Sequence, residues 1–199
     1  MKRFRHFFLV VLGWILLADP AFAVRTVVID AGHGGHDRGG IRRQRYSEKQ
    51  NALDVARRLQ SRLRRAGFRT VMTRDGDYFV SLGARCAIAN RQRSAVFISV
   101  HFNSGAREGA NGIETYYYGR SSAGFAAAVH REVLRAAGTE DRGIRRRGFY
   151  VIRNTRIPAV LAELGFLTNK REGSRINSSA GHRQKLADAL AKAIISKYR

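Results

Sequence analysis

The chain has few cysteines, few prolines and few acidic side chains for its length. Cys86 is the only cysteine among 199 residues, which excludes an intramolecular disulfide as a source of stability. There are two prolines and no repeats or low-complexity tracts, so we expect one bare domain without linkers or an appended binding module. Hydrophobic residues form 44% of the chain, which is enough for a core.

The shortage of acidic side chains leaves the protein strongly basic. Asp and Glu number 15 against 37 Lys and Arg, a net charge of +22 at pH 7. Such an excess is typical of proteins that act on polyanions, including nucleic acids. A solvated, arginine-rich surface without any such partner is the alternative. Charge alone therefore indicates what the protein adheres to and not what it does.

Only one apolar run stands apart from the rest of the sequence, and it lies at the start. Basic residues precede it and a small-x-small tripeptide follows it, in the order Lys2, Arg3, Arg5, Phe7 to Ala18, Asp19-Pro20 and Ala21 to Ala23. This order predicts a secretory signal peptide over residues 1–23, cleaved after Ala23. The apolar run is too short to span a bilayer comfortably.

Export would change the interpretation of the charge. A domain over residues 24–199 delivered to the periplasm or cell envelope meets acidic polymers there rather than nucleic acid. We therefore expect electrostatic attraction to anionic envelope polymers or lipid headgroups, and no nucleic-acid partner. A monomer is expected.

Apolar runs alternate with helical patterns along the chain. Buried strands are expected at 27–31, 95–100 and 158–166, and further strands at 68–73, 112–118 and 149–152. Helices are expected at 47–66, 81–91, 121–137 and 179–198, with a basic loop at 142–147. Ser47 and Gln50 predict a capping box, and Gly67 a left-handed end to the same helix. The alternation predicts an α/β domain with a mostly parallel, twisted sheet and helices on both faces.

Polar residues stand where the apolar strands end. His33 follows the first strand, and His101 and Glu163 come with the other two, while Glu48 begins the helix after the first strand. Carboxyl ends of parallel strands share one edge of a sheet, where a crossover helix also begins, so these four side chains are expected to converge. Each has an ordinary alternative, such as a structural histidine or a helix-dipole acid, but four coincidences would then be needed.

Two imidazoles and two carboxylates suit zinc chemistry. A catalytic zinc site uses three protein ligands and keeps one position open for water, whose pKa falls to about 7. The remaining carboxylate would serve as general base and acid. An unpaired carboxylate in an apolar strand costs several kcal/mol, so Glu163 needs a partner, either metal-bound water or an arginine. His36 is a competing ligand close to His33.

Several segments carry motifs that occur together in one family. They are Asp30 to Asp37, Ser47 to Asn51, Thr73-Arg74, Phe97 to Asn103, Gly112 to Tyr116 and Pro158 to Asn169. In this order, and over almost all of residues 24–199, they resemble the zinc-dependent N-acetylmuramoyl-L-alanine amidases of the amidase-3 type. The resemblance implies that zinc-activated water cleaves the amide between the muramic acid lactyl group and L-alanine in peptidoglycan.

The resemblance also implies roles for individual residues. By it, His33, Glu48 and His101 correspond to the zinc ligands and Glu163 to the catalytic glutamate, whereas His36 falls at a variable position. Three further residues are expected to lie behind the ligands and hold them in place: Asp30, Asn103 and Glu114.

One departure from the family bears on regulation. Members that act in cell division carry a long insertion after the Gly-x-Glu-Thr-x-Tyr strand, and its helix blocks the zinc. Here Tyr118 to Arg120 lead straight to the helix at Ser121, so we expect a site that is open without an activator. Arg145 to Arg147 would steer the substrate, although a solvated loop explains them equally well.

Two other functions remain open at this point. One is a secreted protein that binds murein or another polyanion without catalysis, which would have no use for buried acids and histidines. The other is a zinc peptidase that cuts the stem peptide.

Overall fold

A computed structural model describes residues 24–42, 44–107 and 109–199 of the chain. The expected signal peptide over residues 1–23 lies outside these ranges, so it stays a prediction. Within them, every helix is too short or too polar to cross a membrane.

A central sheet organises the described residues. Its strands are β1 (Thr26–Ala31), β2 (Arg69–Met72), β3 (Ala95–Asn103), β4 (Ile113–Tyr117), β5 (Asp141–Arg146) and β6 (Ala159–Phe166). They lie in the order β2-β1-β3-β6-β4-β5. The first four in this order are parallel, β4 runs antiparallel to β6, and β5 is parallel to β4. The expected α/β domain with a mostly parallel sheet is confirmed.

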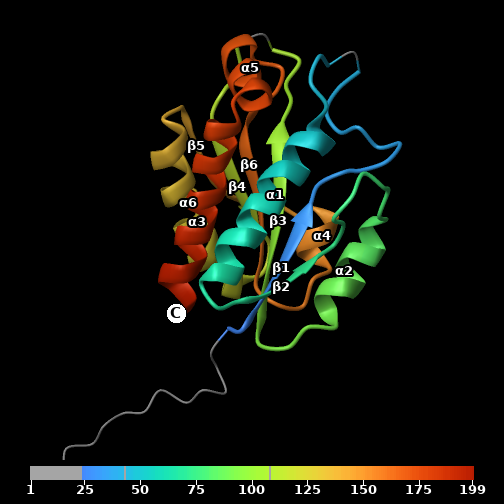
Figure 1. Cartoon of the computed structure of the whole chain (residues 1–199), viewed down its shortest axis with the longest axis vertical. Coiled ribbons are helices and arrows are strands. Elements are labelled where there is room, and N and C mark those ends of the chain that lie inside the picture. The colour runs from blue at the N-terminus through green and yellow to red at the C-terminus, as the bar shows by residue number, and fades with distance from the viewer. Residues whose placement is uncertain (1–23, 43, 108) are drawn as a thin grey trace, which may run out of the picture.

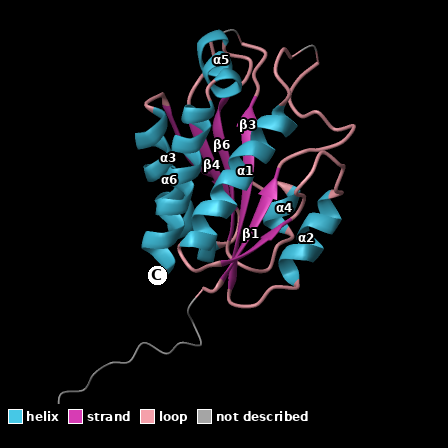
Figure 2. Ribbon diagram, in the orientation of Figure 1, coloured by secondary structure: helices cyan, strands magenta, loops and turns pink. Residues whose placement is uncertain are grey.

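Helices cover both faces of this sheet (Figures 1 and 2). They are α1 (Glu48–Arg65), α2 (Leu82–Asn90), α3 (Ala123–Ala137), α4 (Tyr150–Arg153), α5 (Lys170–Ser178) and α6 (Ala180–Tyr198), with a 3-10 turn η2 (Arg120–Ser122) before α3. The long helices α1, α3 and α6 pack on one face, and the short helices α2 and α4 lie on the other. The second face is therefore the less covered one.

Side-chain alternation along β1 shows why its sequence is mostly apolar. Val27 and Ile29 pack against α1 in the larger core cluster, whereas Val28 packs with Phe97 and Cys86 in the smaller one. All six residues of β1 are buried. A strand covered on both faces has no solvent side to carry polar residues.

Three elements differ from the sequence-based expectation. The expected basic loop at 142–147 forms strand β5, whose side chains are largely exposed because it lies at the sheet edge. The expected strand at 149–152 is the one-turn helix α4, since so short an apolar run has no measurable period. Helix α5 was missed because only Ile176 gives it an apolar face.

The helix ends differ in how they are capped. Ser179 accepts a hydrogen bond from the backbone N–H of His182 at the start of α6. Ser47 occupies the corresponding position of α1, but its hydroxyl makes no capping bond and instead donates to the carbonyl of Arg38. The prediction of a capping box is therefore wrong, because the Ser47 side chain makes no hydrogen bond to the first turn of α1. Gly67 has a φ of +87°, which confirms the left-handed end of that helix.

Replacing the two cap serines separates these cases. Ser179→Ala removes a bond to an otherwise unsatisfied N–H, and we expect the free energy of unfolding to fall by about 1 kcal/mol. Ser47→Ala, the matched control, removes no such bond and should cost less than half as much. Urea unfolding followed by circular dichroism measures both, and equal losses would contradict this account.

Candidate active site

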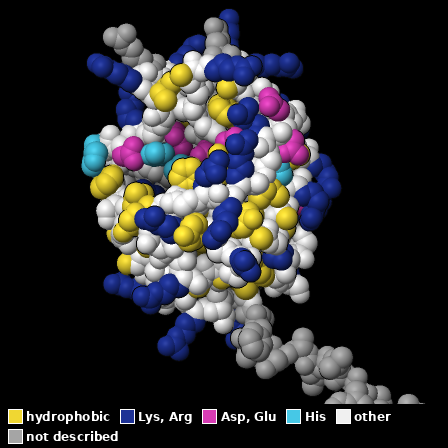
Figure 3. All heavy atoms as spheres, turned by 180° about the vertical axis from the view of Figure 1, so that it is seen from behind, with side chains coloured by type: hydrophobic (Ala, Val, Ile, Leu, Met, Phe, Trp, Pro, Cys, Tyr) yellow, Lys and Arg dark blue, Asp and Glu magenta, His cyan; other side chains and the backbone are white. Residues whose placement is uncertain are grey.

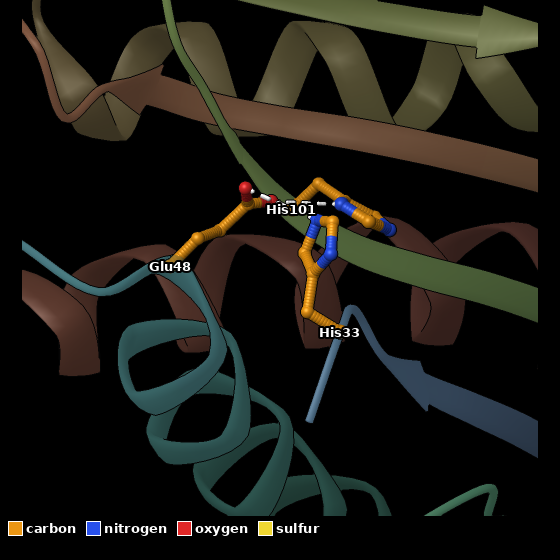
Figure 4. A group of neighbouring side chains, drawn as sticks. All are labelled: His33, Glu48 and His101. Atoms are coloured by element: carbon orange, nitrogen blue, oxygen red, sulfur yellow. Dashed lines mark hydrogen bonds and ion pairs between the residues drawn. The ribbon is translucent and has the colours of Figure 1, made fainter. Parts of the chain in front are cut away.

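Three side chains from distant parts of the chain meet at one edge of the sheet (Figure 4). His33 lies in the loop after β1, Glu48 is the first residue of α1, and His101 lies near the end of β3. Each offers one ligand atom within 4.8 Å of the others. Glu48 contacts both rings, with Oε2 3.1 Å from His33 Nε2 and Oε1 2.8 Å from His101 Nδ1. The structure thus brings together the three residues predicted as zinc ligands.

Two glycines leave the space that this cluster occupies. A Cβ on Gly32 would lie 2.4 Å from Cε1 of His101, and one on Gly39 would lie 2.6 Å from Glu48 Oε2 and from His33 Cδ2. Gly39 also has a φ of +70°, which other residues rarely adopt. A side chain at either position would displace a member of the cluster.

The electrostatics of the cluster favour an ionised glutamate. Burial raises the pKa of Glu48, but its hydrogen bonds with His101 and His33 outweigh this and bring the pKa to about 2. The backbone N–H of Phe102 also donates to Oε1. Burial lowers the pKa of His33, while Glu48 and Asp37 raise it by more. Asp37 lies 2.8 Å from Nδ1 of His33 and orients the ring.

Glu163 lies beside this cluster without a partner of its own. The sheet register places it between His101 on β3 and Glu114 on β4, so all three side chains project from the same face. Within the described residues, its Oε2 is shielded from solvent and has no hydrogen-bond partner. Burial, and then the charges of Glu48 and Glu114, raise the pKa of Glu163 well above its usual value. The sequence predicted metal-bound water or an arginine as the partner of this carboxyl. Within the described residues, no arginine forms a hydrogen bond with its Oε2.

The residues present fit a zinc ion. Two imidazoles and one carboxylate are a set that zinc accepts in catalytic sites, with a further position left for water. A divalent cation held by His33, Glu48 and His101 would also offset the crowding of carboxylates around Glu163, because an opposite charge nearby favours the ionised form.

A buried ion pair supports the loop that carries His33. Asp30 accepts hydrogen bonds from Thr73 (2.6 Å), Arg85 (2.7 Å) and Ser99 (2.6 Å). Burial raises the pKa of Asp30, but the Arg85 charge and the two hydroxyls outweigh this and lower it. Arg85 also donates to the carbonyl of His33 at 2.7 Å. Asp30 therefore reaches the candidate ligand through Arg85.

A second buried arginine holds the same loop. Arg74 is 1% exposed and donates to the carbonyls of Ala31, Gly32 and Lys49. Sequence reasoning gave neither arginine a role. For Arg85 a signal existed, because it lies on the buried face of α2 beside Cys86, where a charged residue needs a reason.

The other predicted site residues lie around Glu163 or away from it. Asn103 donates to Glu114 at 2.7 Å, and Tyr116 and Arg142 bind the same carboxylate, so Asn103 contacts Glu114 rather than a candidate ligand. His36 packs on Phe79, with ring centroids 4.3 Å apart, outside the cluster.

The three arginines expected to steer the substrate lie on β5 and just beyond it. Arg145 lies 3.9 Å from a Glu114 oxygen, and Arg146 packs over the ring of Tyr118 and donates to its carbonyl. Arg147 follows them and is exposed.

Comparisons with known proteins agree with the fold and identify a family. Residues 27–196 match the model of the Amidase_3 family, described as N-acetylmuramoyl-L-alanine amidase. The catalytic domain of CwlV, an N-acetylmuramoyl-L-alanine amidase from Bacillus (Paenibacillus) polymyxa, superposes with a TM-score of 0.83 at 36% identity, covering 87% of this chain and 97% of that one. AmiC2 of Nostoc punctiforme gives 0.81 at 36% identity, with 86% and 96% covered.

Two relatives found by sequence are also similar over most of this chain. The uncharacterized protein YqiI of Bacillus subtilis is 38% identical, over 87% of this chain and 85% of its own. The amidase LytC of Bacillus subtilis is 34% identical over 87% of this chain, but this chain spans only 36% of LytC. The family match and the similar structures together define an amidase, an enzyme of the hydrolase class. The chain belongs to the N-acetylmuramoyl-L-alanine amidase family of the Amidase_3 type.

Removing Asp30 tests the support beneath the loop. Asp30→Ala leaves Arg85 buried without its carboxylate, and we expect the free energy of unfolding to fall by about 3–5 kcal/mol at pH 7. The control Asp188→Ala breaks an exposed pair with Arg62 and should cost under about 1 kcal/mol.

The pH dependence of this difference has a definite sign. The pKa of Asp30 is lower in the folded chain than its unfolded value of about 3.9, so its contribution is complete above that pH and is lost as the pH falls through the folded pKa. Urea unfolding of the wild type and Asp30→Ala should therefore converge in acid. A difference that persists unchanged at acid pH would refute the assignment.

Gly32→Ala tests the packing of the cluster. We expect the folded protein to retain less zinc, because the new Cβ displaces the His101 ring. Gly83→Ala is the control, since its Cβ meets nothing nearer than 4.0 Å. Zinc content after dialysis, with circular dichroism to verify folding, distinguishes them. Equal zinc in both variants would count against the role of Gly32.

Proposed function

We propose that this protein hydrolyses the amide between the lactyl group of N-acetylmuramic acid and L-alanine in peptidoglycan, with zinc as its cofactor. The observation that carries the proposal is the unpaired Glu163 carboxyl beside the His33–Glu48–His101 cluster. A structural cluster would leave no such carboxyl unsatisfied, because an unpaired polar group is costly. Membership of the amidase family supports the choice of bond.

In this proposal His33, Glu48 and His101 hold the zinc. When bound, zinc supplies Lewis acidity, which polarises a carbonyl and lowers the pKa of water. Glu163 accepts a proton from the attacking water at its free Oε2 and then donates it to the departing amine of L-alanine. Its location between His101 and Glu114 keeps the carboxyl partly desolvated, which suits a group that must both take up and release a proton.

The residues behind the cluster act by position. Asp30, through Arg85, holds the backbone of His33, and Asp37 orients the ring of His33. Asn103 holds Glu114 beside Glu163. A loop held at several points keeps the ligand geometry without waiting for substrate.

The setting of the reaction is also part of the proposal. Residues 1–23 would direct the chain to the periplasm or cell envelope, where its positive charge attracts anionic polymers. There it would act on peptidoglycan as a monomer and without nucleic acid. A relative named "Probable cell wall amidase LytH" supports this setting. β4 passes to α3 through η2 alone, with no helix inserted to cover the cluster, so we propose activity without an activator.

Glu163→Gln tests the catalytic assignment. We expect hydrolysis of purified sacculi to fall by 10²-fold or more, on the scale of lost general acid–base catalysis, while zinc content is unchanged. His101→Ala should lose both zinc and activity. Mass spectrometry of the wild-type digest should show free amino-terminal L-alanine on the released peptides, without any added protein.

Other results would identify other functions. Retained turnover in Glu163→Gln would remove this residue from the mechanism. Products cut within the stem peptide would identify a peptidase, and zinc-free protein that binds sacculi without products would identify a binding protein. Activity that appears only after addition of an activator protein would refute the open site.

A further inference from the structure

A mostly apolar groove lies next to the candidate ligands, between α2 and α4. Its volume is about 410 Å³, within the range of small-ligand sites. His33 and His101 lie at one end, and the apolar lining includes Phe79, Val80, Leu82, Phe149, Tyr150 and Leu161. Figure 3 shows hydrophobic side chains gathered below the histidines and carboxylates on this face.

The groove walls present apolar surface to solvent. Phe79, Leu82, Phe149 and Tyr150 are each between 43% and 52% exposed, although they are large and apolar. Contiguous exposed apolar side chains of this kind mark binding sites. These exposed side chains contribute little to the buried core, so they indicate a ligand with apolar surface.

The charges of the groove exclude one class of ligand. Arg85 is the sole cation among its lining residues, and its guanidinium is committed to Asp30 and to the carbonyls of Ala31, Val80 and His33. Asp37 adds a carboxylate to the lining. Apart from the zinc that His33 and His101 would hold at one end, a ligand that carries carboxylates would therefore meet repulsion and no free countercharge along the groove.

The opposite side of His33 has a different character. A second hollow of about 390 Å³ lies there, and its lining includes Arg38, Arg42 and Gln44. It is polar, and its two arginines outnumber Asp37, which lines this hollow as well as the groove, so it suits an acidic ligand better than the groove does.

The substrate of the proposed function has the same asymmetry. The amide joins an N-acetylated sugar, which is uncharged there and has an apolar ring face and methyl groups, to a stem peptide that carries carboxylates. We propose that the groove between α2 and α4 binds the N-acetylmuramoyl sugar, so that the stem peptide leaves on the side of Arg38 and Arg42. This inference rests on the proposed amidase function.

Two substrates separate the sugar from the bond. One is an N-acetylmuramoyl peptide, and the other is the same peptide carrying only the D-lactyl group. The zinc-loaded wild type should cleave the first with a kcat/KM at least about tenfold higher, since a filled apolar subsite contributes on this scale. The double variant Leu82→Ala/Tyr150→Ala should lose about tenfold on the muramoyl peptide, mainly through KM, and nothing on the lactyl peptide.

Ile144→Ala is the matched control, because Ile144 is an exposed apolar residue of β5 that does not line the groove. It should change neither rate, and thermal unfolding should show that all variants fold. Equal losses on both substrates, or no loss on the muramoyl peptide, would overturn the sugar subsite and leave the amidase function standing. Failure of the wild type to cleave either substrate would instead refute the proposed function.

Discussion

A carboxylate removed from water needs a positive charge nearby, and this requirement governs the site edge of the sheet. Asp30 meets it with Arg85, and the pair is almost fully buried beneath the loop after β1. Glu163 has no such partner among the described residues, and its Oε2 makes no hydrogen bond there. The contrast between two acids on the same face, one paired and one not, is what separates a structural carboxylate from a candidate catalytic one.

The two buried arginines show how backbone and site are coupled. Arg74 and Arg85 together bind the carbonyls of Ala31, Gly32 and His33, which leave the ladder as β1 ends. Without the two arginines, these carbonyls would need water molecules as hydrogen-bond donors. The loop thus gains rigidity from side chains that themselves never touch the candidate ligands' donor atoms.

The convergence of the candidate site residues was predictable from the sequence because its signals are local. His33, His101 and Glu163 each come with an apolar run, and Glu48 begins a strongly periodic helix, so parallel-sheet topology was enough to bring them together. The supporting contacts were not predictable in this way. Arg85 and Asp30 are 55 positions apart, and their pairing depends on how α2 packs under β1. Strand β5 was not predicted either. It is an edge strand of largely exposed, basic residues, so its sequence shows no alternation of buried and exposed positions.

The reversed direction of β4 has a consequence for how the enzyme can diversify. Because β4 runs against β6, the connection from β3 turns back at the site edge instead of crossing the sheet. The border of the candidate active site is therefore made partly of the connection from β3 to β4, which passes the end of β6 and whose length no strand pairing constrains. Insertions there would reshape access to the substrate while the hydrogen-bonded register of every strand stayed the same.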